Sequence, residues 1–168
     1  MSSKKTLIDK LLLTVYVWHR ICINNDRRCK MRKDVKLNIT KSIPFLQSYG
    51  ERLTSRMYEI LFEGNPELKS MFESDNSTKL AGALLAFAQN LERLNVLEPA
   101  LNKMALSHVK AGVKPEHYEK AWDALYKAMT EFGISNEIIE AWKEAYYFLA
   151  ELLIKKEEKL YTCLATSL

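Results

Sequence analysis

Short breaks divide this sequence into segments whose apolar residues recur at helical spacing. Between residues 31 and 168, glycines, prolines and small polar residues cluster at Gly50, 64–66, 74–78, 98–99, 111–115 and 133–136. Inside the segments, for example over 80–94 and 138–153, leucines and aromatic residues return every three or four positions, which is the period of one helix face. Only 5 glycines and 4 prolines occur, and no segment alternates apolar and polar residues as a half-buried strand does. The pattern predicts an all-α fold.

The predicted helices are unequal in length. Asn65, Pro66 and Glu67 predict a cap, a first-turn proline and an acid near the positive end of a helix dipole, which together open a short helix ending at Met71. Ser135 with Glu137 predicts the start of the last helix in the same way. Roughly six helices, one of them very short, favour irregular helix packing over a regular up-down bundle.

All of the net positive charge of the chain comes from the first 30 residues. They contain 7 Lys or Arg and 2 Asp or Glu, whereas the rest of the chain contains 18 and 19. A nearly neutral body has no broad basic face for a phosphate backbone, so we do not expect nucleic-acid binding. Cys22, Cys29 and Cys163 form neither a disulfide framework nor a zinc-binding spacing, which favours reduced thiols in a cytoplasmic protein.

Residues 1–30 are interpreted as a basic N-terminal extension of a domain that spans residues 31–168. Charged residues interrupt the apolar stretch 7–23, so it lacks the ~20 apolar residues that span a bilayer. Asp9 and Lys10, and the absence of a small-residue cleavage motif, argue against a signal peptide. Two interpretations stay open: a flexible basic helix that contacts a membrane surface or a partner, and a start codon assigned upstream of a natural first residue at Met31.

One histidine lies on the apolar face of a predicted helix. Over residues 99–110, His108 shares a face with Leu101, Met104 and Ala105. The imidazole therefore points toward the core. A neutral imidazole in a pocket that excludes water is what an axial haem ligand requires. A hydrogen-bonded core histidine would show the same pattern, so spacing alone leaves both interpretations open.

Short motifs run in a fixed order along residues 43–161. Six of them are Ile43-Pro44-Phe45-Leu46, Asn65-Pro66-Glu67-Leu68-Lys69, His108-Val109, Gly112-Val113-Lys114-Pro115-Glu116-His117-Tyr118, Ala141-Trp142 and Lys159-Leu160-Tyr161. In order and spacing they resemble the globin domain of bacterial flavohaemoglobins and their single-domain relatives. The resemblance implies a globin fold of about six to eight helices around a pocket for haem b.

The resemblance also implies roles for three residues on the proximal side. His108 resembles the iron ligand, and Tyr118 and Glu157 resemble the tyrosine and glutamate that support it. A carboxylate and a phenol near the second ring nitrogen fix the tautomer and raise the imidazole's electron donation, which favours peroxidase-like or dioxygenase chemistry over storage. The alternatives are a helix-start aromatic residue for Tyr118 and a solvated acid for Glu157.

Four residues are expected on the distal side. Tyr58 resembles the distal tyrosine, whose phenol can donate to bound oxygen, although a core aromatic residue would fit the same pattern. Phe72 resembles the phenylalanine packed on the haem face, and Leu80 the distal apolar residue. Between these two the chain is several residues shorter than in flavohaemoglobins. Asn76 lies on the same helical face as Leu80, where the family usually has glutamine, and is either a distal donor or a helix cap.

Three functions follow from these expectations. The first is reversible binding of oxygen and nitric oxide through haem iron, for oxygen transport, storage or gas scavenging. The second is a nitric oxide dioxygenase in which Tyr58, Tyr118 and Glu157 assist; because the sequence stops soon after Tyr161, no flavin or nicotinamide domain is expected, and an external reductase must supply electrons. The third is a haem-free helical sensor or interaction module.

Overall fold

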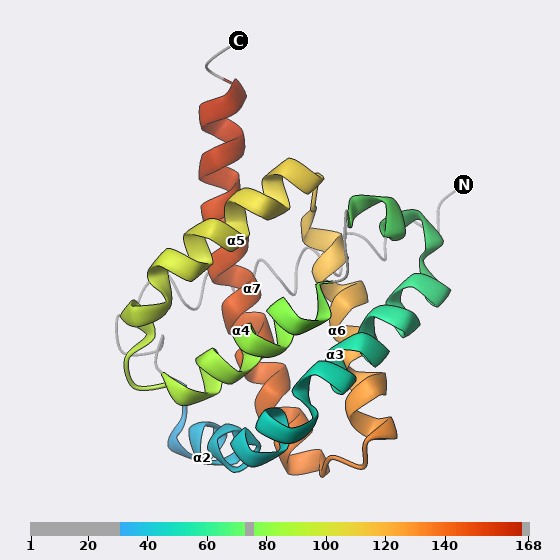
Figure 1. The fold of residues 1–168 in the computed structure, drawn as a ribbon. Helices are drawn as coiled ribbons and strands as arrows, with labels where there is room; N and C mark the ends of the chain where they lie inside the picture. The colour runs from blue at the N-terminus through green and yellow to red at the C-terminus, as the bar shows by residue number, and fades with distance from the viewer. Residues whose placement is uncertain (1–30, 73–75, 166–168) are drawn as a thin grey trace, which may run out of the picture. The chain divides into compact units, whose positions relative to one another are not determined.

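The computed structural model describes residues 31–72 and 76–165, so the extension predicted for residues 1–30 lies outside the described residues. The described residues form helices joined by short turns and contain no strand, which confirms the all-α prediction (Figure 1). The α-helices are α2 (Lys33–Lys41), α3 (Ile43–Gly64), α4 (Ser77–Gln89), α5 (Glu98–Ala111), α6 (Pro115–Glu131) and α7 (Asn136–Ala165), and the 3₁₀ helices are η1 (Pro66–Met71) and η2 (Leu94–Leu97). No described helix is both long enough and apolar enough to cross a membrane.

Helix boundaries follow the glycines and prolines of the sequence, with one exception in detail. α5 ends at Ala111 and is capped by Gly112, whose φ of 73° is left-handed, and Pro115 opens α6. Asn65 occupies the predicted N-cap position of the short helix Pro66–Met71, but its side chain makes no cap hydrogen bond. Its Nδ2 instead donates to the carbonyl of Leu61 at 3.1 Å, so Asn65 closes α3, and the short helix that follows is 3₁₀ rather than α.

Two groups of helices carry the core. α3 packs on α4 and on α6, whereas α2 and α5 pack on α7. In the described chain, α4 and α5 make no extensive contact with each other. α4 packs on α3, and α5 packs on α7. Six large apolar side chains are almost fully buried, and burial of each stabilises the fold by about 1.5–3 kcal/mol. They are Trp142, Phe87, Ile39, Leu53, Leu125 and Met129.

Buried polar groups join helices that are distant in the sequence. The indole Nε1 of Trp142 donates to Oγ of Ser42 at 3.0 Å, and this hydroxyl donates to the carbonyl of Ile39 at 2.6 Å. The hydroxyl of Thr54 lies 2.8 Å from the carbonyl oxygen of Ser77 and is fully buried. Because Thr54 belongs to α3 and Ser77 begins α4, this contact fixes the start of α4 against α3.

Candidate functional site

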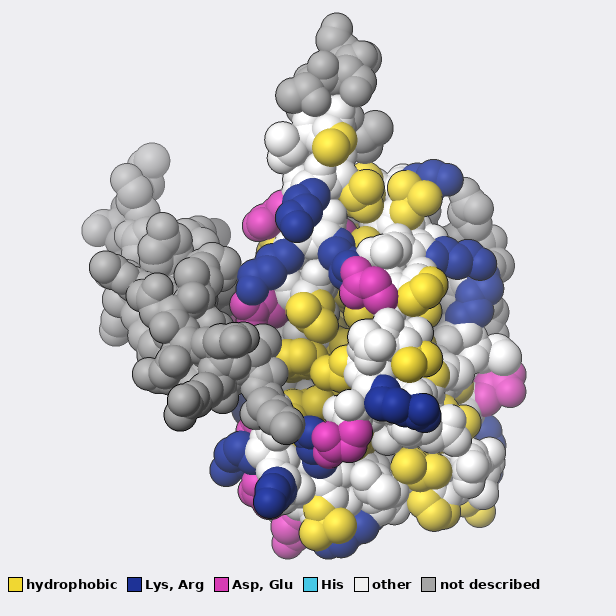
Figure 2. All heavy atoms as spheres, turned by 90° about the vertical axis from the view of Figure 1, so that its left-hand side faces the viewer, with side chains coloured by type: hydrophobic (Ala, Val, Ile, Leu, Met, Phe, Trp, Pro, Cys, Tyr) yellow, Lys and Arg dark blue, Asp and Glu magenta, His cyan; other side chains and the backbone are white. Residues whose placement is uncertain are grey.

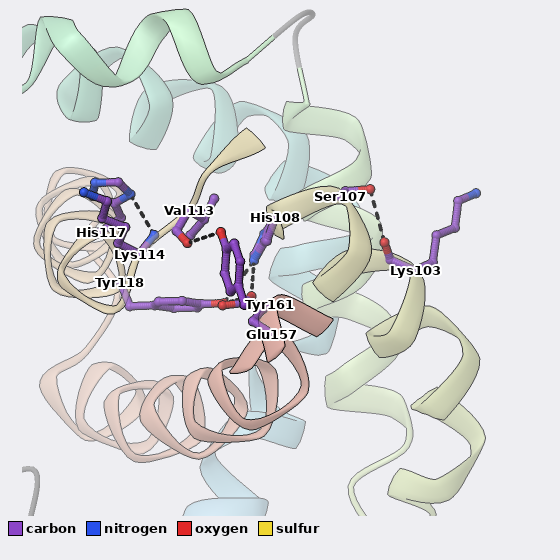
Figure 3. Close-up of polar contacts among 9 residues, drawn as sticks. All are labelled: Lys103, Ser107, His108, Val113, Lys114, His117, Tyr118, Glu157 and Tyr161. Atoms are coloured by element: carbon purple, nitrogen blue, oxygen red, sulfur yellow. Dashed lines mark hydrogen bonds and ion pairs between the residues drawn. The ribbon is translucent and has the colours of Figure 1, made fainter. Parts of the chain in front are cut away.

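His108, Tyr118 and Glu157 meet although they come from α5, α6 and α7 (Figure 3). Nδ1 of His108 lies 2.8 Å from Oε1 of Glu157 and 3.0 Å from the Tyr118 hydroxyl. The same hydroxyl donates to Oε1 of Glu157 at 2.6 Å. The structure thus brings together the three residues to which the sequence resemblance gave proximal roles.

The carboxylate of Glu157 is placed in the core. Glu157 is 3% exposed, and a buried carboxylate is costly unless hydrogen-bond donors replace water. Tyr118 and the imidazole supply those donors. Burial raises the pKa of the Tyr118 phenol, and the hydrogen bond to Glu157 raises it further, so the phenol keeps its proton and remains a donor.

This geometry determines which ring nitrogen of His108 can bind a metal. A carboxylate at Nδ1 favours the tautomer with the proton on Nδ1, which leaves a lone pair on Nε2. Nε2 makes no hydrogen bond to any residue in 31–72 or 76–165. In the same part of the chain, no three His, Cys, Asp or Glu side chains gather as a metal-binding group. The donor set is therefore a single imidazole, which suits a metal whose other ligands come from a prosthetic group such as haem.

Apolar side chains pack around Tyr118, the residue whose hydroxyl contacts His108. Leu101, Ala105, Ala150 and Leu153 form a buried cluster with Tyr118. Partly buried hydrophobic side chains pack against it, and they include Leu97, Met104, Val113, Leu149 and Leu152. On the face shown in Figure 2, hydrophobic side chains gather in a hollow of the surface. Partly buried apolar side chains in such numbers fit a large apolar ligand, because its binding would complete their burial.

Tyr146 adds a link that the sequence did not single out. Its hydroxyl donates to the backbone carbonyl of Tyr118 at 2.7 Å. Burial raises the pKa of the Tyr146 phenol, and the neighbouring phenols of Tyr147 and Tyr58 raise it further. Its position in the sequence could have indicated this role, because Tyr146 lies on the same face of α7 as Ala150, Leu153 and Glu157.

Tyr58 belongs to a small aromatic group with Phe62 and Phe72. Its ring centroid lies 5.3 Å from that of Phe72 and 5.7 Å from that of Phe62, and the two phenylalanines are 5.1 Å apart. All three side chains are partly buried. Tyr58 and Phe72, both expected on the distal side, are therefore in contact, and the aromatic neighbours restrict the orientation of the phenol.

Asn76 occupies the N-cap position of α4. Its side chain makes no cap hydrogen bond; Oδ1 accepts instead from Nζ of Lys79 at 3.1 Å. The backbone carbonyl of Asn76 accepts from the amide of Leu80 at 2.9 Å, which places Leu80 in the first turns of α4, partly buried. The side-chain cap offered by the sequence is thus not formed, and the distal role of Asn76 stays a prediction. Residues 73–75 of the shortened segment lie outside the described residues.

Comparison with known proteins gives the family. The profile of the Globin family matches residues 55–152, which is more than half of the chain. The chain belongs to the globin family. An uncharacterised globin-like protein of Aquifex aeolicus is 41% identical over 128 residues, which cover 74% of this chain and 92% of that protein. The family resemblance and the globin fold expected from the sequence are confirmed.

Solved structures and longer relatives extend the comparison. An engineered form of RmaNOD, a carbene transferase and proposed nitric oxide dioxygenase from Rhodothermus marinus, superposes with a TM-score of 0.78 and 38% identity, covering 80% of this globin and 99% of that chain. A bacterial globin of Campylobacter jejuni superposes with a TM-score of 0.73 and 35% identity, and the match covers 78% of this globin and 99% of that chain. A flavohemoprotein of Oceanobacillus iheyensis is 36% identical over 132 residues, and the globin spans 73% of its own length but 32% of that protein.

Proposed function

We propose that this globin binds haem b through Nε2 of His108 and uses it to bind oxygen and nitric oxide reversibly. The observation that carries the proposal is the hydrogen bond of Nδ1 to the buried Glu157 carboxylate, because it directs the free lone pair of Nε2 to a ligand. Haem, when bound, supplies the iron to which diatomic gases coordinate.

Glu157 and Tyr118 support the proximal ligand in this proposal. Glu157 holds the proton on Nδ1 and, by accepting from it, raises the electron density that the imidazole donates. Tyr118 donates to the same oxygen of Glu157 and so keeps the carboxylate in place. A neutral acceptor in place of Glu157 would weaken both effects.

Tyr58, Phe72 and Leu80 serve the distal side. With haem in place, the Tyr58 hydroxyl would donate a hydrogen bond to a gas on the iron, which would carry partial negative charge, and this bond would slow release of the gas. Contact with Phe62 and Phe72 limits the motion of the Tyr58 ring. In this proposal, the apolar side chains of Phe72 and Leu80 exclude water from the distal side, where the gas would bind.

Nitric oxide dioxygenation is a second candidate, favoured by the carboxylate at Nδ1. Stronger donation from the imidazole favours oxidative chemistry over simple storage. The balanced reaction joins nitric oxide, oxygen and one electron to give nitrate. The electron must come from a donor, so this candidate includes an external reductase as a partner. The proposed activity of RmaNOD and the match to flavohemoproteins point in the same direction.

Absorption spectra of the full chain, expressed with ample haem supply, test the proposal. We expect ferric, ferrous and oxygenated forms with a Soret band and one haem per chain. His108→Ala should abolish stable haem binding, whereas His117→Ala should keep it, because Nδ1 of His117 accepts a bond from the backbone of Lys114. A wild-type chain without a Soret band would overturn the proposal and favour the haem-free module.

Nitrate yield separates the carrier from the dioxygenase. The oxygenated protein is mixed with nitric oxide, with and without a reductase and its electron donor. Nitrate formed over many turnovers with the reductase supports the dioxygenase. Formation of one nitrate per haem under both conditions leaves reversible gas binding as the function.

A further inference from the structure

Tyr161 is connected by two hydrogen bonds to the backbone of His108. The Tyr161 hydroxyl donates to the carbonyl oxygen of Val113 at 3.1 Å, and the amide of Val113 donates to the carbonyl oxygen of His108 at 2.9 Å (Figure 3). Gly112 lies between them in the left-handed conformation that turns the chain away from α5. Tyr161 therefore contacts the turn that closes α5 directly after His108.

The same face of α7 also supplies the carboxylate that accepts from His108. Glu157 and Tyr161 are four residues apart, which places them one helical turn apart on one face. α7 thus contacts the last turn of α5 at Nδ1 of His108, and it contacts the loop that follows α5 at the carbonyl of Val113. Since both contacts come from one helix, they fix the imidazole relative to its carboxylate.

The hydroxyl of Tyr161 is the part of this side chain suited to such a role. Tyr161 is 40% exposed, so its ring is not a fully buried core group. Replacement by phenylalanine retains the ring and removes only the donor to Val113.

We propose that Tyr161 is a positioning residue for His108, and this inference rests on the proposed function of His108 as the haem ligand. By holding the turn at Val113, Tyr161 keeps the end of α5 at the distance from α7 at which Nδ1 donates well to Glu157. Without the hydroxyl, the turn moves more freely, the Nδ1 hydrogen bond lengthens, and the imidazole donates less electron density.

Resonance Raman spectra of the ferrous haem-loaded full chain test the inference, with amide hydrogen exchange as a second measurement. In Tyr161→Phe, we expect the iron–histidine stretch at a lower frequency than in the wild type and faster exchange of the Val113 amide. Tyr126→Phe changes an exposed phenol on α6 and should leave both unchanged. Lys156→Met removes contacts to Glu98 and Asn102 near the start of α5, and should leave the stretch unchanged because it does not act on the Val113 turn.

The outcomes separate this inference from the proposed function. If the wild type shows the iron–histidine stretch and Tyr161→Phe shows it at the same frequency, the positioning role is overturned and His108 remains the ligand. An equal shift in Lys156→Met also overturns it, since the effect would then come from loosening α7 in general. A wild type that takes up no haem overturns the proposed function, and the positioning role with it.

Discussion

The Tyr118 hydroxyl lies 2.6 Å from Oε1 of Glu157, although 39 residues separate the two in the sequence. Because Glu157 is 3% exposed, this phenol replaces water that the carboxylate would otherwise bind. Hydrogen bonds to charged groups contribute about 1.5–3 kcal/mol. We expect Tyr118→Phe to lower the free energy of unfolding by that amount, measured by urea denaturation of the haem-free chain.

Two further variants control this prediction. Tyr126→Phe removes an exposed phenol and should change the free energy of unfolding by less than about 0.5 kcal/mol. In a Glu157→Gln background the cost of Tyr118→Phe should shrink, because the charge is gone. Equal costs in both backgrounds would show that the ring's packing, rather than the hydrogen bond, carries the effect.

Three phenols should make the fold sensitive to alkali. Burial is the main reason that the pKa values of Tyr118, Tyr146 and Tyr147 are raised. The folded chain therefore keeps protons that the unfolded chain releases near pH 10, so this stability is complete below about pH 10 and falls as pH rises further. Phenolate absorbance should show these tyrosines titrating after the exposed ones, together with unfolding. Simultaneous titration of all tyrosines near pH 10 without unfolding would contradict the prediction.

The small side chain of Ser42 should contribute strongly to the stability of the fold. It accepts the indole N–H of Trp142, which is 1% exposed, so Ser42→Ala leaves a buried donor unpaired. Such a donor costs about 1–3 kcal/mol, and thermal or urea unfolding should report a loss of that size. Ser107→Ala is the matched control, because Ser107 is exposed and its hydroxyl bonds only within its own helix, to Lys103. A similar loss in both variants would show that the indole contact is not the cause.

Replacing Gly112 or Gly82 by alanine should change the free energy of unfolding in opposite directions. Gly112 has a φ of 73°, where an L side chain is strained, so Gly112→Ala should destabilise the chain by about 1–2 kcal/mol. Gly82 lies inside α4, and an added Cβ would meet nothing within 4 Å there. Gly82→Ala should therefore stabilise by about 0.5–1 kcal/mol through helix propensity. Chemical denaturation measures both, and the same sign in the two variants would contradict the conformational argument.

Local features of the fold were predictable because their causes lie in neighbouring residues. Gly112 and Pro115 mark a helix end and the next helix start through backbone conformation alone. Asn65 shows where this fails: its amide could serve either the helix before it or the helix after it, and only the folded geometry selects the carbonyl of Leu61.

The candidate site depends on distant contacts that spacing cannot give. His108 and Glu157 are 49 residues apart, and only the family resemblance suggested that they meet. Tyr161 was not singled out as a site residue because its partner is a backbone carbonyl, which leaves no mark in the sequence. The spacing offered Asn76 as a helix cap or a distal donor, and it did not indicate that its side chain accepts from Lys79.

The hydrogen-bonded group of His108, Tyr118 and Glu157 has a consequence for how the chain loses its structure. Its three side chains come from α5, α6 and α7, so the group exists only while all three helices are docked. Opening of the end of α7 alone would separate Glu157 from His108 and release the imidazole from its fixed tautomer, with most of the helices still formed. When the haem-loaded protein is heated gently, the absorption bands that report ligation of the haem by His108 should therefore change at a lower temperature than the far-ultraviolet circular dichroism of the helices.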